Sequence, residues 1–413
     1  MPNTGTLIVG AGHAGAQAAA ALRQFGYEKP ITLLTEETDP PYERPPLSKD
    51  YLARDKTFDA ILLRPATFWA SKNITLTLGQ RAVAIDAAGH ALHTADGTAI
   101  AYETLIWAAG GHARRLACTG HHLTGIHTIR TRADVDLMQA ELAHTETVAV
   151  IGGGYIGLEA AAVLRKLGKS VVVIEMQDRV LARVAGPALS RFYEEEHRLH
   201  GVTLLLNTAV ECIEERDGRA AGVRLANGTI IAADMIVVGV GIIPAVGPLR
   251  EAGAAGANGI DVDEHCRTSL PDIYAIGDCA AHINPYAPAG QRIRLESVQN
   301  ANDQAATAAK SIIAAATGAP APHYDAVPWF WSNQYDLRLQ TIGLSTGYDE
   351  TVLRGDPGAR SFSLIYLRAG QVIALDCVNA TRDYVQGKPL VVNRRIIDKA
   401  LLADTAIPLK THG

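Results

Sequence analysis

The chain has 413 residues, and its 43 acidic against 38 basic side chains give a formal net charge of −5 at pH 7. Proteins that bind nucleic acid or anionic membranes need clustered positive charge, so this balance argues against both functions. Hydrophobic residues make up 48% of the chain and charged residues 20%, which supports a large core and argues against disorder. At about 150 residues per domain, the length predicts two or three domains.

The sequence predicts no membrane anchor, export signal or disulfide framework. A transmembrane helix needs roughly 18–20 uninterrupted apolar residues, and the longest apolar stretch, 230–249, contains Asp234, Pro244 and several glycines. The N-terminus lacks the basic region of a signal peptide. The five cysteines, at positions 118, 212, 266, 279 and 377, form no Cys-x-x-Cys pair. We therefore expect free thiols in a reducing cytoplasm.

The first predicted elements form a strand–turn–helix–strand unit. An apolar strand leads into a glycine-rich turn over residues 7–15, Leu-Ile-Val-Gly-Ala-Gly-His-Ala-Gly. An alanine-rich pattern predicts a helix over 16–25, which Gly26 is placed to end. A second strand is expected over 31–35.

The same unit occurs again near the middle of the chain. Residues 148–157, Val-Ala-Val-Ile-Gly-Gly-Gly-Tyr-Ile-Gly, are followed by a predicted helix over 158–167 and a strand over 170–174. Each copy continues into a predicted β-meander with its own turn, Asp-Gly at 96–97 in the first and Asn-Gly at 227–228 in the second. The chain therefore uses one supersecondary plan twice.

The glycines of both copies follow the pattern of a dinucleotide-binding turn. In Gly-x-Gly-x-x-Gly the first glycine makes the tight turn, the second lets the backbone approach a pyrophosphate, and the third lets helix and strand pack closely. The phosphates lie at the helix N-terminus, where N–H groups and the helix dipole favour negative charge. An acidic residue about 20 positions further on binds the ribose hydroxyls. Two sites are thus predicted, on Gly10, Gly12, Gly15 and Glu36 in the first copy and on Gly152, Gly154, Gly157 and Glu175 in the second.

Glu175 also indicates which nicotinamide nucleotide the second site prefers. A carboxylate accepts a hydrogen bond from the 2′-hydroxyl of NAD, whereas it repels the 2′-phosphate of NADP. Arg179, four residues further on, could weaken that repulsion. NADH is the expected donor.

Two patterns point to other chemistry but lack its structural context. Residues 343–347, Gly-Leu-Ser-Thr-Gly, match the serine-hydrolase elbow, which must lie between a strand and a helix. A second strand is expected after this segment, over 348–353, so a turn is the better interpretation. His197 and His200 have helical spacing within a charged stretch, which indicates a solvated helix face. None of the 14 histidines has a zinc-ligand spacing, and no metal site is expected.

Four segments outside the repeats carry distinctive residues. Residues 40–49 contain four prolines, which hold the charged side chains of this loop on a stiff backbone. Residues 268–278 read as a strand that ends in Gly-Asp, and residues 294–300 precede a helix predicted over 301–316. Residues 328–331, Pro-Trp-Phe-Trp, cluster aromatics in a chain with only 6% of them. Taken singly, the segments indicate a surface connector, a turn, a helix start and core packing.

Together these segments resemble the FAD-dependent, NADH-dependent ferredoxin reductases of bacterial oxygenase systems, the putidaredoxin reductase and rubredoxin reductase family. The likeness runs from residue 7 to about residue 388. Its most specific parts are Pro-x-x-Arg-Pro-Pro-Leu-Ser-Lys49, Ile-Gly-Gly-Gly-Tyr-Ile-Gly-Leu-Glu159, Tyr-Ala-Ile-Gly-Asp278 and Pro-Trp-Phe-Trp331. One departure is Ala109-Gly110, where the family usually has Thr-Gly.

The resemblance implies an α/β fold with two Rossmann-like dinucleotide-binding domains of the glutathione-reductase-like kind and a C-terminal α+β domain. It places a discontinuous FAD-binding domain at 1–110 and 247–325. An NAD-binding domain would occupy 111–246, and the C-terminal domain would occupy 326–413.

The resemblance also implies the site residues. Lys49 and Glu159 are expected to carry catalysis as a pair, since a buried charge needs a partner. Asp278 would bind the ribityl or pyrophosphate region of FAD, the Val298 backbone would approach the flavin ring, and Trp331 would lie near the exposed flavin edge. The cofactor-binding set comprises Gly10, Gly12, Ala14, Gly15, Glu36, Arg44, Lys49, Ala82, Arg130, Gly152, Gly154, Tyr155, Ile156, Gly157, Glu159, Glu175, Gly241, Asp278, Glu296, Ser297, Val298 and Trp331.

The reaction implied is hydride transfer from NADH to FAD, followed by two single-electron transfers to a two-iron ferredoxin that feeds an oxygenase. A flavin must stand between the partners because NADH gives two electrons at once, while an iron–sulfur protein accepts one. Arg292 and Arg294 are expected to attract the acidic ferredoxin, with Trp331 as an apolar anchor.

Four other functions of the same fold are considered. A disulfide reductase or peroxidase would need a cysteine beside the flavin, and residues 36–60 contain none. A flavoprotein of the apoptosis-inducing-factor type would need a basic surface for nucleic acid, and an NADH oxidase would pass its electrons to oxygen directly. The last two stay open as alternatives.

Overall fold

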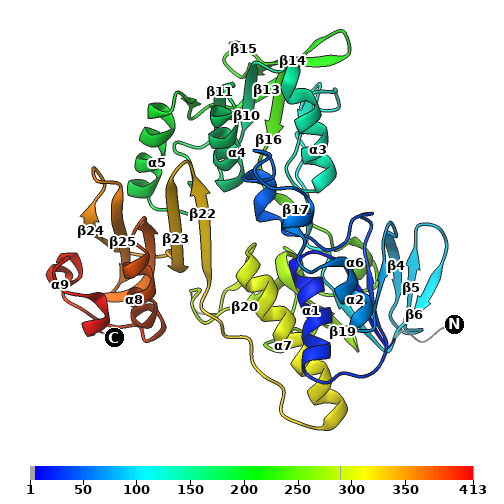
Figure 1. Ribbon diagram of the computed structural model, residues 1–413. Helices are drawn as coiled ribbons and strands as arrows, with labels where there is room; N and C mark the ends of the chain where they lie inside the picture. Colours follow the sequence, from blue (N-terminus) through cyan, green and yellow to red (C-terminus); the bar gives the residue numbers. More distant parts are fainter. Residues whose placement is uncertain (1–4, 289, 413) are drawn as a thin grey trace. The chain divides into compact units, whose positions relative to one another are not determined.

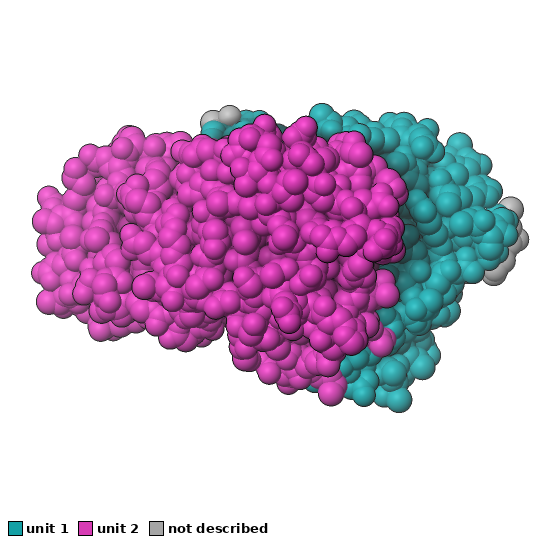
Figure 2. Space-filling model, turned by 90° about the horizontal axis from the view of Figure 1, so that it is seen from above, with its two compact units in different colours: residues 1–44, 58–112, 243–330 teal, residues 45–57, 113–242, 331–413 magenta. Residues whose placement is uncertain are grey.

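The computed structural model describes residues 5–288 and 290–412. The chain forms two compact units, coloured separately in Figure 2. Unit 1 comprises Met1–Arg44, Phe58–His112 and Ile243–Phe330, and unit 2 comprises Pro45–Thr57, Ala113–Ile242 and Trp331–Gly413.

Unit 1 is built on a five-stranded parallel sheet (Figure 1). Its order is β19-β7-β1-β2-β3, so the strand order reverses at β1, between β2 and β7. Ligands of such open sheets bind at the carboxyl end of the strands where the order reverses. The strands are β1 (Thr6–Val9), β2 (Ile31–Leu34), β3 (Ile74–Thr77), β7 (Thr104–Trp107) and β19 (Ile273–Ala275).

Two alanine-rich helices cover one face of this sheet. Helices α1 (His13–Gln24) and α7 (Val298–Thr317) lie side by side in Figure 1, and the alanines at their contact allow a close approach. Along β1, Ile8 packs toward the helices, while Leu7 and Val9 pack into the core on the opposite face. The remaining elements are η2 (Asp59–Ile61), α2 (Ala66–Ser71), β4 (Ala82–Asp86), β5 (Ala91–Thr94), β6 (Ala99–Ala101), α6 (Gly247–Glu251), β18 (Ile260–Asp261), η4 (Gly277–Cys279), β20 (Ala280–Ile283) and β21 (Arg292–Arg294).

Unit 2 repeats the plan in its first part. A parallel sheet of order β12-β11-β10-β16-β9 reverses at β10, and the antiparallel meander β13-β14-β15 shares a core with it. The strands are β9 (Ile126–His127), β10 (Thr147–Ile151), β11 (Ser170–Ile174), β12 (Thr203–Leu205), β13 (Val210–Arg216), β14 (Arg219–Leu225), β15 (Ile230–Ala232) and β16 (Met235–Val238). The helices are η1 (Pro45–Ser48), α3 (Arg132–Glu141), η3 (Leu142–His144), α4 (Tyr155–Lys166) and α5 (Pro187–Leu199).

The C-terminal part of unit 2 is a second sheet, of order β22-β23-β26-β25-β24, in which β23 to β26 pair antiparallel. Helix α8 packs against β26 and β23. The elements are β22 (Trp329–Gln334), β23 (Leu337–Gly343), β24 (Glu350–Asp356), β25 (Ser361–Arg368), β26 (Gln371–Val378), α8 (Thr381–Val392), α9 (Lys399–Ala403) and η5 (Leu409–His412). The short strands β8 (Gly111–Ala113) and β17 (Ile242–Pro244) contain chain positions at which one unit ends and the other begins.

The expected fold class is confirmed, and the strand–turn–helix–strand unit is present twice. Ser345 lies in a turn between β23 and β24, as the rejection of the hydrolase elbow requires. All five cysteines are free thiols. Among the described residues, no helix is long and apolar enough to cross a membrane. The boundaries of three domains stay a prediction.

Candidate functional site

The two glycine turns have nearly the same geometry. Gly10 has φ +102° and Gly152 has φ +106°, values that L side chains rarely adopt. A Cβ on Gly10 would lie 2.3 Å from the Ala108 carbonyl oxygen, and one on Gly152 would lie 2.5 Å from that of Gly239. Each first glycine is therefore required both by its backbone and by the chain that passes beside it.

The remaining glycines prepare a helix N-terminus for a phosphate. A Cβ on Gly15 would lie 1.8 Å from the Gly10 oxygen, and one on Gly157 would lie 2.0 Å from the Gly152 oxygen, so only glycine lets the helix approach its strand. A Cβ on Gly12 or Gly154 would meet nothing within 4 Å. These second glycines, the N-cap residues of α1 and α4, face open space where the helix dipole favours an anion. Both turns fit a dinucleotide pyrophosphate.

The two predicted ribose-binding glutamates follow β2 and β11, as expected, but they are held differently. Glu175 Oε2 accepts a 2.6 Å hydrogen bond from the Gly153 amide, and Oε1 accepts a 2.8 Å bond from the Gln177 amide. Glu36 is half exposed, with Arg81 Nε at 3.8 Å and His112 Nδ1 at 3.9 Å. Glu175 is therefore fixed against its glycine turn by backbone amides, whereas the contacts of Glu36 to Arg81 and His112 are long.

Arg179 does not face the nucleotide side of Glu175. Its guanidinium donates to the carbonyls of Ala182 and Ala185 and to Ser190 Oγ, at 2.8–3.0 Å. It thus stabilises the loop before α5 and the start of that helix. The possibility that it weakens the repulsion of a 2′-phosphate loses support.

Arg44 belongs to a polar cluster of unit 1. It forms an ion pair with Glu37, and its Nη1 lies 2.6 Å from the Tyr42 hydroxyl, which donates to Glu37 at 2.5 Å. Burial acts to lower the pKa of Arg44, but Tyr42, Glu37 and Asp278 outweigh it, so the pKa is raised. Arg44 is therefore a permanent cation whose field reaches Asp278.

The turn that carries Asp278 packs against the first turn of α1. Asp278 is part of η4, and a Cβ on its neighbour Gly277 would be 3.0 Å from Cβ of Ala14. Arg294 Nη1 donates to the Asp278 carbonyl at 2.8 Å and pairs with Glu296 at 2.7 Å. Unit 1 thus brings the first glycine turn and the Gly-Asp turn together.

The expectation that Arg294 is an exposed docking residue is wrong. Its side chain is only 10% exposed because it is hydrogen-bonded to the turn that carries Asp278. Arg292 donates to the carbonyls of Val262 and Ala281 and pairs with Asp261 at 3.5 Å. Both arginines stabilise contacts within unit 1, and the docking role of Arg292, which is exposed, stays a prediction.

Lys49 and Glu159 form the expected ion pair within unit 2. Lys49 Nζ lies 2.5 Å from Glu159 Oε2, which also accepts a 2.6 Å bond from Ser48 Oγ. Glu159 Oε1 accepts a 2.6 Å bond from Ser332 Oγ. Glu159 is 1% exposed and Lys49 14%, so the pair lies largely out of water. The arrangement holds a cation at a fixed position with no added net charge.

The first turn of α4 presents one half-buried and one exposed side chain. Burial raises the pKa of Tyr155 well above its ordinary value, and Asp376, Tyr193 and Glu159 add to the effect. Ile156 is 43% exposed beside the open second glycine. Tyr155 is therefore a neutral phenol, and Ile156 presents an exposed apolar side chain.

The other predicted residues occupy element ends. Ser297 caps α7 by accepting from the Asn300 amide at 3.1 Å, and Val298 is the first residue of that helix. Gly241 has φ +93°. Unit 1 holds Gly10, Gly12, Ala14, Gly15, Glu36, Arg44, Ala82, Asp278, Glu296, Ser297 and Val298, and unit 2 holds Lys49, Arg130, Gly152, Gly154, Tyr155, Ile156, Gly157, Glu159, Glu175, Gly241 and Trp331.

Three residues of the Glu159 surroundings were missed from the sequence. Ser48 and Ser332 gave no signal of their own, although Ser48 lies next to Lys49 and Ser332 follows the aromatic motif. His197 was interpreted as part of a solvated helix face, and this is wrong, because it is 0% exposed. Its Nε2 lies 2.8 Å from Gln334 Oε1 in the C-terminal sheet.

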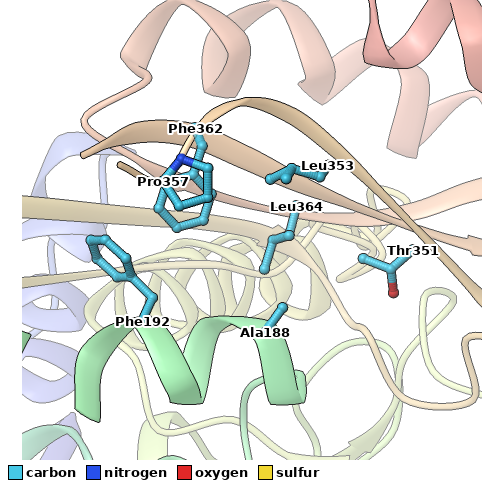
Figure 3. Close-up of a pocket in the computed structure, with 7 residues that line it drawn as sticks. All are labelled: Ala188, Phe192, Thr351, Leu353, Pro357, Phe362 and Leu364. Carbon is cyan, nitrogen blue, oxygen red and sulfur yellow. The ribbon is translucent and has the colours of Figure 1, made fainter. Parts of the chain in front are cut away.

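An apolar hollow of about 260 Å³ lies between α5 and strands β24 and β25 (Figure 3). The rings of Phe192 and Phe362 meet there edge to face, 4.9 Å apart. Thr351 is the one lining residue with a polar side chain, and none of the predicted site residues lines the hollow. Without converging polar groups it does not qualify as the reaction site.

One group of possible metal ligands occurs among the described residues. The ligand atoms of Glu264, His265 and His323 lie within 4.8 Å of one another, and two of the three residues are exposed. His265 Nδ1 lies 2.8 Å from the Pro322 carbonyl oxygen. The group lies outside the predicted site, and the expectation of no metal stays a prediction.

Family models match almost the whole chain. Residues 4–305 match the pyridine nucleotide-disulphide oxidoreductase family, and residues 329–412 match the reductase C-terminal family. The fold and the site therefore define a class of oxidoreductase that binds two nucleotides and transfers electrons between them.

Individual relatives narrow this class. The chain is 62% identical to the 5,5'-dehydrodivanillate O-demethylase ferredoxin reductase subunit of Sphingobium sp. (strain NBRC 103272 / SYK-6), over 99% of this chain and 98% of the relative. It matches a ferredoxin reductase from Rhodopseudomonas palustris with TM-score 0.94 and 39% identity, covering 99% of both chains. It matches putidaredoxin reductase, solved in a covalent complex with putidaredoxin, with TM-score 0.93 and 36% identity, covering 99% of this chain and 97% of the other.

The chain belongs to the FAD-dependent ferredoxin reductases of oxygenase systems, within the pyridine nucleotide-disulphide oxidoreductases. The resemblance inferred from the sequence is confirmed. Members of the family use FAD and NAD(P)H and pass electrons to a ferredoxin, which confirms the expected cofactors and activity.

Proposed function

We propose that this chain moves electrons from NADH through FAD to a two-iron ferredoxin, which serves an oxygenase in the cytoplasm. One observation carries the proposal: each compact unit contains a glycine turn at a helix N-terminus whose second glycine faces open space. A hydride donor and a resident flavin nucleotide need two such turns. The printed names of the relatives support the partners, since one is a subunit of an O-demethylase and another was solved with its ferredoxin.

We assign FAD to the turn of unit 1, where Gly12 opens toward a phosphate and Arg44 and Asp278 supply a fixed cation and an acceptor. FAD, when bound, takes up two electrons together and releases them singly. The residues Ala14, Ala82, Ser297 and Val298 would shape the site, and the Arg294–Glu296 pair would hold the Asp278 turn in place.

We assign NADH to the turn of unit 2, with Glu175 against its adenosine ribose. The carboxylate is already held by two backbone amides, so it cannot swing away from a 2′-phosphate without losing both hydrogen bonds. A desolvated like-charge contact is strongly unfavourable. This geometry supports a preference for NADH over NADPH.

We propose that Lys49 and Glu159 are the catalytic pair. The buried carboxylate fixes Lys49 Nζ at 2.5 Å, which presents a positive charge at one place while the pair stays neutral. A charge that is already oriented stabilises developing negative charge without reorganisation. Trp331, at the start of the unit 2 part of β22, would then serve as an apolar contact for the ferredoxin.

The test begins with the chromophore of the purified protein. We expect a yellow protein with one non-covalent FAD per chain, rapid anaerobic bleaching by NADH, and re-oxidation by a two-iron ferredoxin in two one-electron steps. FMN, or no chromophore, would overturn the proposal. Re-oxidation by oxygen as fast as by ferredoxin would favour an NADH oxidase instead.

A further inference from the structure

Four side chains of unit 2 form a continuous hydrogen-bonded chain that ends on Glu159. The Tyr335 hydroxyl lies 2.9 Å from His197 Nδ1, and His197 Nε2 lies 2.8 Å from Gln334 Oε1. Gln334 Nε2 donates to Ser332 Oγ at 3.2 Å, and Ser332 donates to Glu159 Oε1 at 2.6 Å. The chain connects α5, the β22–β23 turn and α4.

All donors in this chain point toward Glu159. The Gln334 amide oxygen only accepts, so His197 must carry its proton on Nε2, and its Nδ1 is then the acceptor for the Tyr335 hydroxyl. Burial lowers the pKa of His197 to about 4, which keeps the imidazole neutral at working pH. Hydrogen bonds that are aligned in this way strengthen one another. Their common acceptor is the Glu159 carboxylate.

The chain is enclosed except at its outer end. Ser332 and His197 are 0% exposed, and Gln334 is 1% exposed. A buried polar chain of this kind loses much of its value if one member fails to find its partner. The outer member, Tyr335, lies on the two-residue turn that joins β22 to β23.

Tyr335 adopts a backbone conformation that a tyrosine normally avoids. Its φ is +57°, in the left-handed region, which is strained for a residue with a side chain. The turn places its ring 3.7 Å from the ring of His200, stacked at an interplanar angle of 12°, and its hydroxyl on His197. Asparagine or glycine would suit the turn better, so the local backbone alone does not account for a tyrosine here.

We propose that Ser332, Gln334, His197 and Tyr335 are positioning residues that orient the Glu159 carboxylate against Lys49. The inference rests on the proposed catalytic role of the Lys49–Glu159 pair. The chain orients and does not conduct protons, because the neutral amide of Gln334 stands between His197 and Ser332 and does not exchange a proton between its oxygen and its nitrogen at working pH.

The first test compares two buried serines that donate to a carboxylate within unit 2. Ser332→Ala removes the donor to Glu159, and Ser363→Ala removes a 3.1 Å donor to Asp383 away from the chain. A hydrogen bond to a charged group corresponds to roughly a tenfold effect or more. We expect Ser332→Ala to slow anaerobic flavin reduction about tenfold, with unchanged FAD content, and Ser363→Ala to leave the rate unchanged. Equal rates in the two variants would overturn the inference.

The second test asks whether the chain acts through the pair. In a Lys49→Met background, Ser332→Ala should have no further effect on the rate, whereas additive losses would show that Ser332 acts independently of Lys49. Tyr335→Phe should slow the reaction several-fold, while Tyr27→Phe, which loses a 2.8 Å bond to Thr6, should not.

A third measurement does not depend on turnover. In urea unfolding, Ser332→Ala and Glu159→Gln should show a coupling that Ser363→Ala and Glu159→Gln lack. If Lys49→Met reduces flavin as fast as the unchanged protein, the proposed function of the pair fails. If Lys49→Met is slow but Ser332→Ala and Tyr335→Phe are not, only the positioning role fails.

Discussion

Replacement of Lys49 by methionine tests the proposed pair most directly. Methionine keeps much of the length of the lysine side chain but removes the ammonium group, so the buried Glu159 loses its cation. Glu159 is 1% exposed in the unchanged protein, and its two donors, Ser48 and Ser332, each at 2.6 Å, are still present in the variant. Breaking a buried ion pair by removing one partner typically costs 3–5 kcal/mol. With the two serines still present, we expect the free energy of unfolding to fall by about 3 kcal/mol.

A second substitution separates stability from chemistry. In Lys49→Met/Glu159→Gln, no unpaired charge remains in the site, and the amide can accept from one serine through its oxygen and donate to the hydroxyl oxygen of the other through its nitrogen. We therefore expect the double variant to recover most of the lost stability, because the penalty comes from the isolated charge. Flavin reduction should stay slow, since the oriented cation is still missing.

The assays are urea unfolding followed by circular dichroism and anaerobic stopped-flow mixing with NADH at 450 nm. Reduction at least tenfold slower in both variants, with stability restored only in the double variant, is the expected result. A rate that recovers together with stability would refute the reasoning, because Lys49 would then act only through the fold. An unchanged rate in the single variant would show that Lys49 takes no part in flavin reduction.

The remaining predictions concern other parts of the molecule. Glu175→Ala should raise KM for NADH about tenfold or more and narrow the preference over NADPH, as measured by kcat/KM for both nucleotides. Burial raises the pKa of Asp376 to about 7, so its folded form holds a proton that the unfolded form releases near pH 4; the stabilising contribution is complete below pH 4 and is lost as pH rises through 7. Asp376→Asn should therefore gain stability relative to the unchanged protein from pH 5 to pH 8, on the order of a few kcal/mol in urea unfolding. Arg294→Ala should lower FAD content, and ferredoxin reduction per bound flavin should keep its salt dependence. Dialysis against EDTA should leave ferredoxin reduction unchanged, and a loss restored by zinc would instead assign a metal to the group of Glu264, His265 and His323.

The parts of the fold that the sequence predicts are those whose cause is local. The geometry of a glycine turn such as Gly10 to Gly15 can be predicted from its own sequence. The contacts that exclude a Cβ come from the turn itself, from Ile8 just before it and from the chain at 108–109 beside it. The helices after both turns were expected to begin at residues 16 and 158 and begin earlier, at His13 and Tyr155. The difference arises because the third glycine of each turn, Gly15 or Gly157, lies in the first turn of its helix.

The surroundings of His197 could not be predicted in this way. Its helix carries several charged residues, a pattern typical of solvent exposure. In the structure one of them, Glu196, is paired with Arg360 at 3.0 Å, and His197 is paired with Gln334. Gln334 is the last residue of β22 and Arg360 lies in the turn before β25, and both are more than 130 positions away in the sequence. A polar helix face can be buried when another segment supplies matching polar groups, and one helix alone does not reveal this.

Arg294 illustrates the opposite error, in which a charge close in sequence to the site was given a role at the surface. Its nearest acceptors are the Asp278 carbonyl and the Glu296 carboxylate. The arginine therefore binds two residues of the predicted FAD site and does not extend from the surface beside that site. The net charge does not reveal which of the 38 basic residues are exposed, because the fold decides which of them form ion pairs.

The Lys49–Glu159 pair lies between these cases. That the two residues would meet was expected from a resemblance, but the geometry that fixes them is not local. Glu159 receives hydrogen bonds from Ser48 in the proline-rich turn and from Ser332 in β22, so three segments spread over the chain of unit 2 converge on one carboxylate. Each carboxylate oxygen of Glu159 accepts from a serine distant in the sequence, Ser48 for Oε2 and Ser332 for Oε1. Together the two serines restrict the rotation of the carboxylate more than either would alone. Orientation of the pair is therefore a property of how these segments pack, and it should respond to a change at Tyr335, which lies three hydrogen bonds from Ser332.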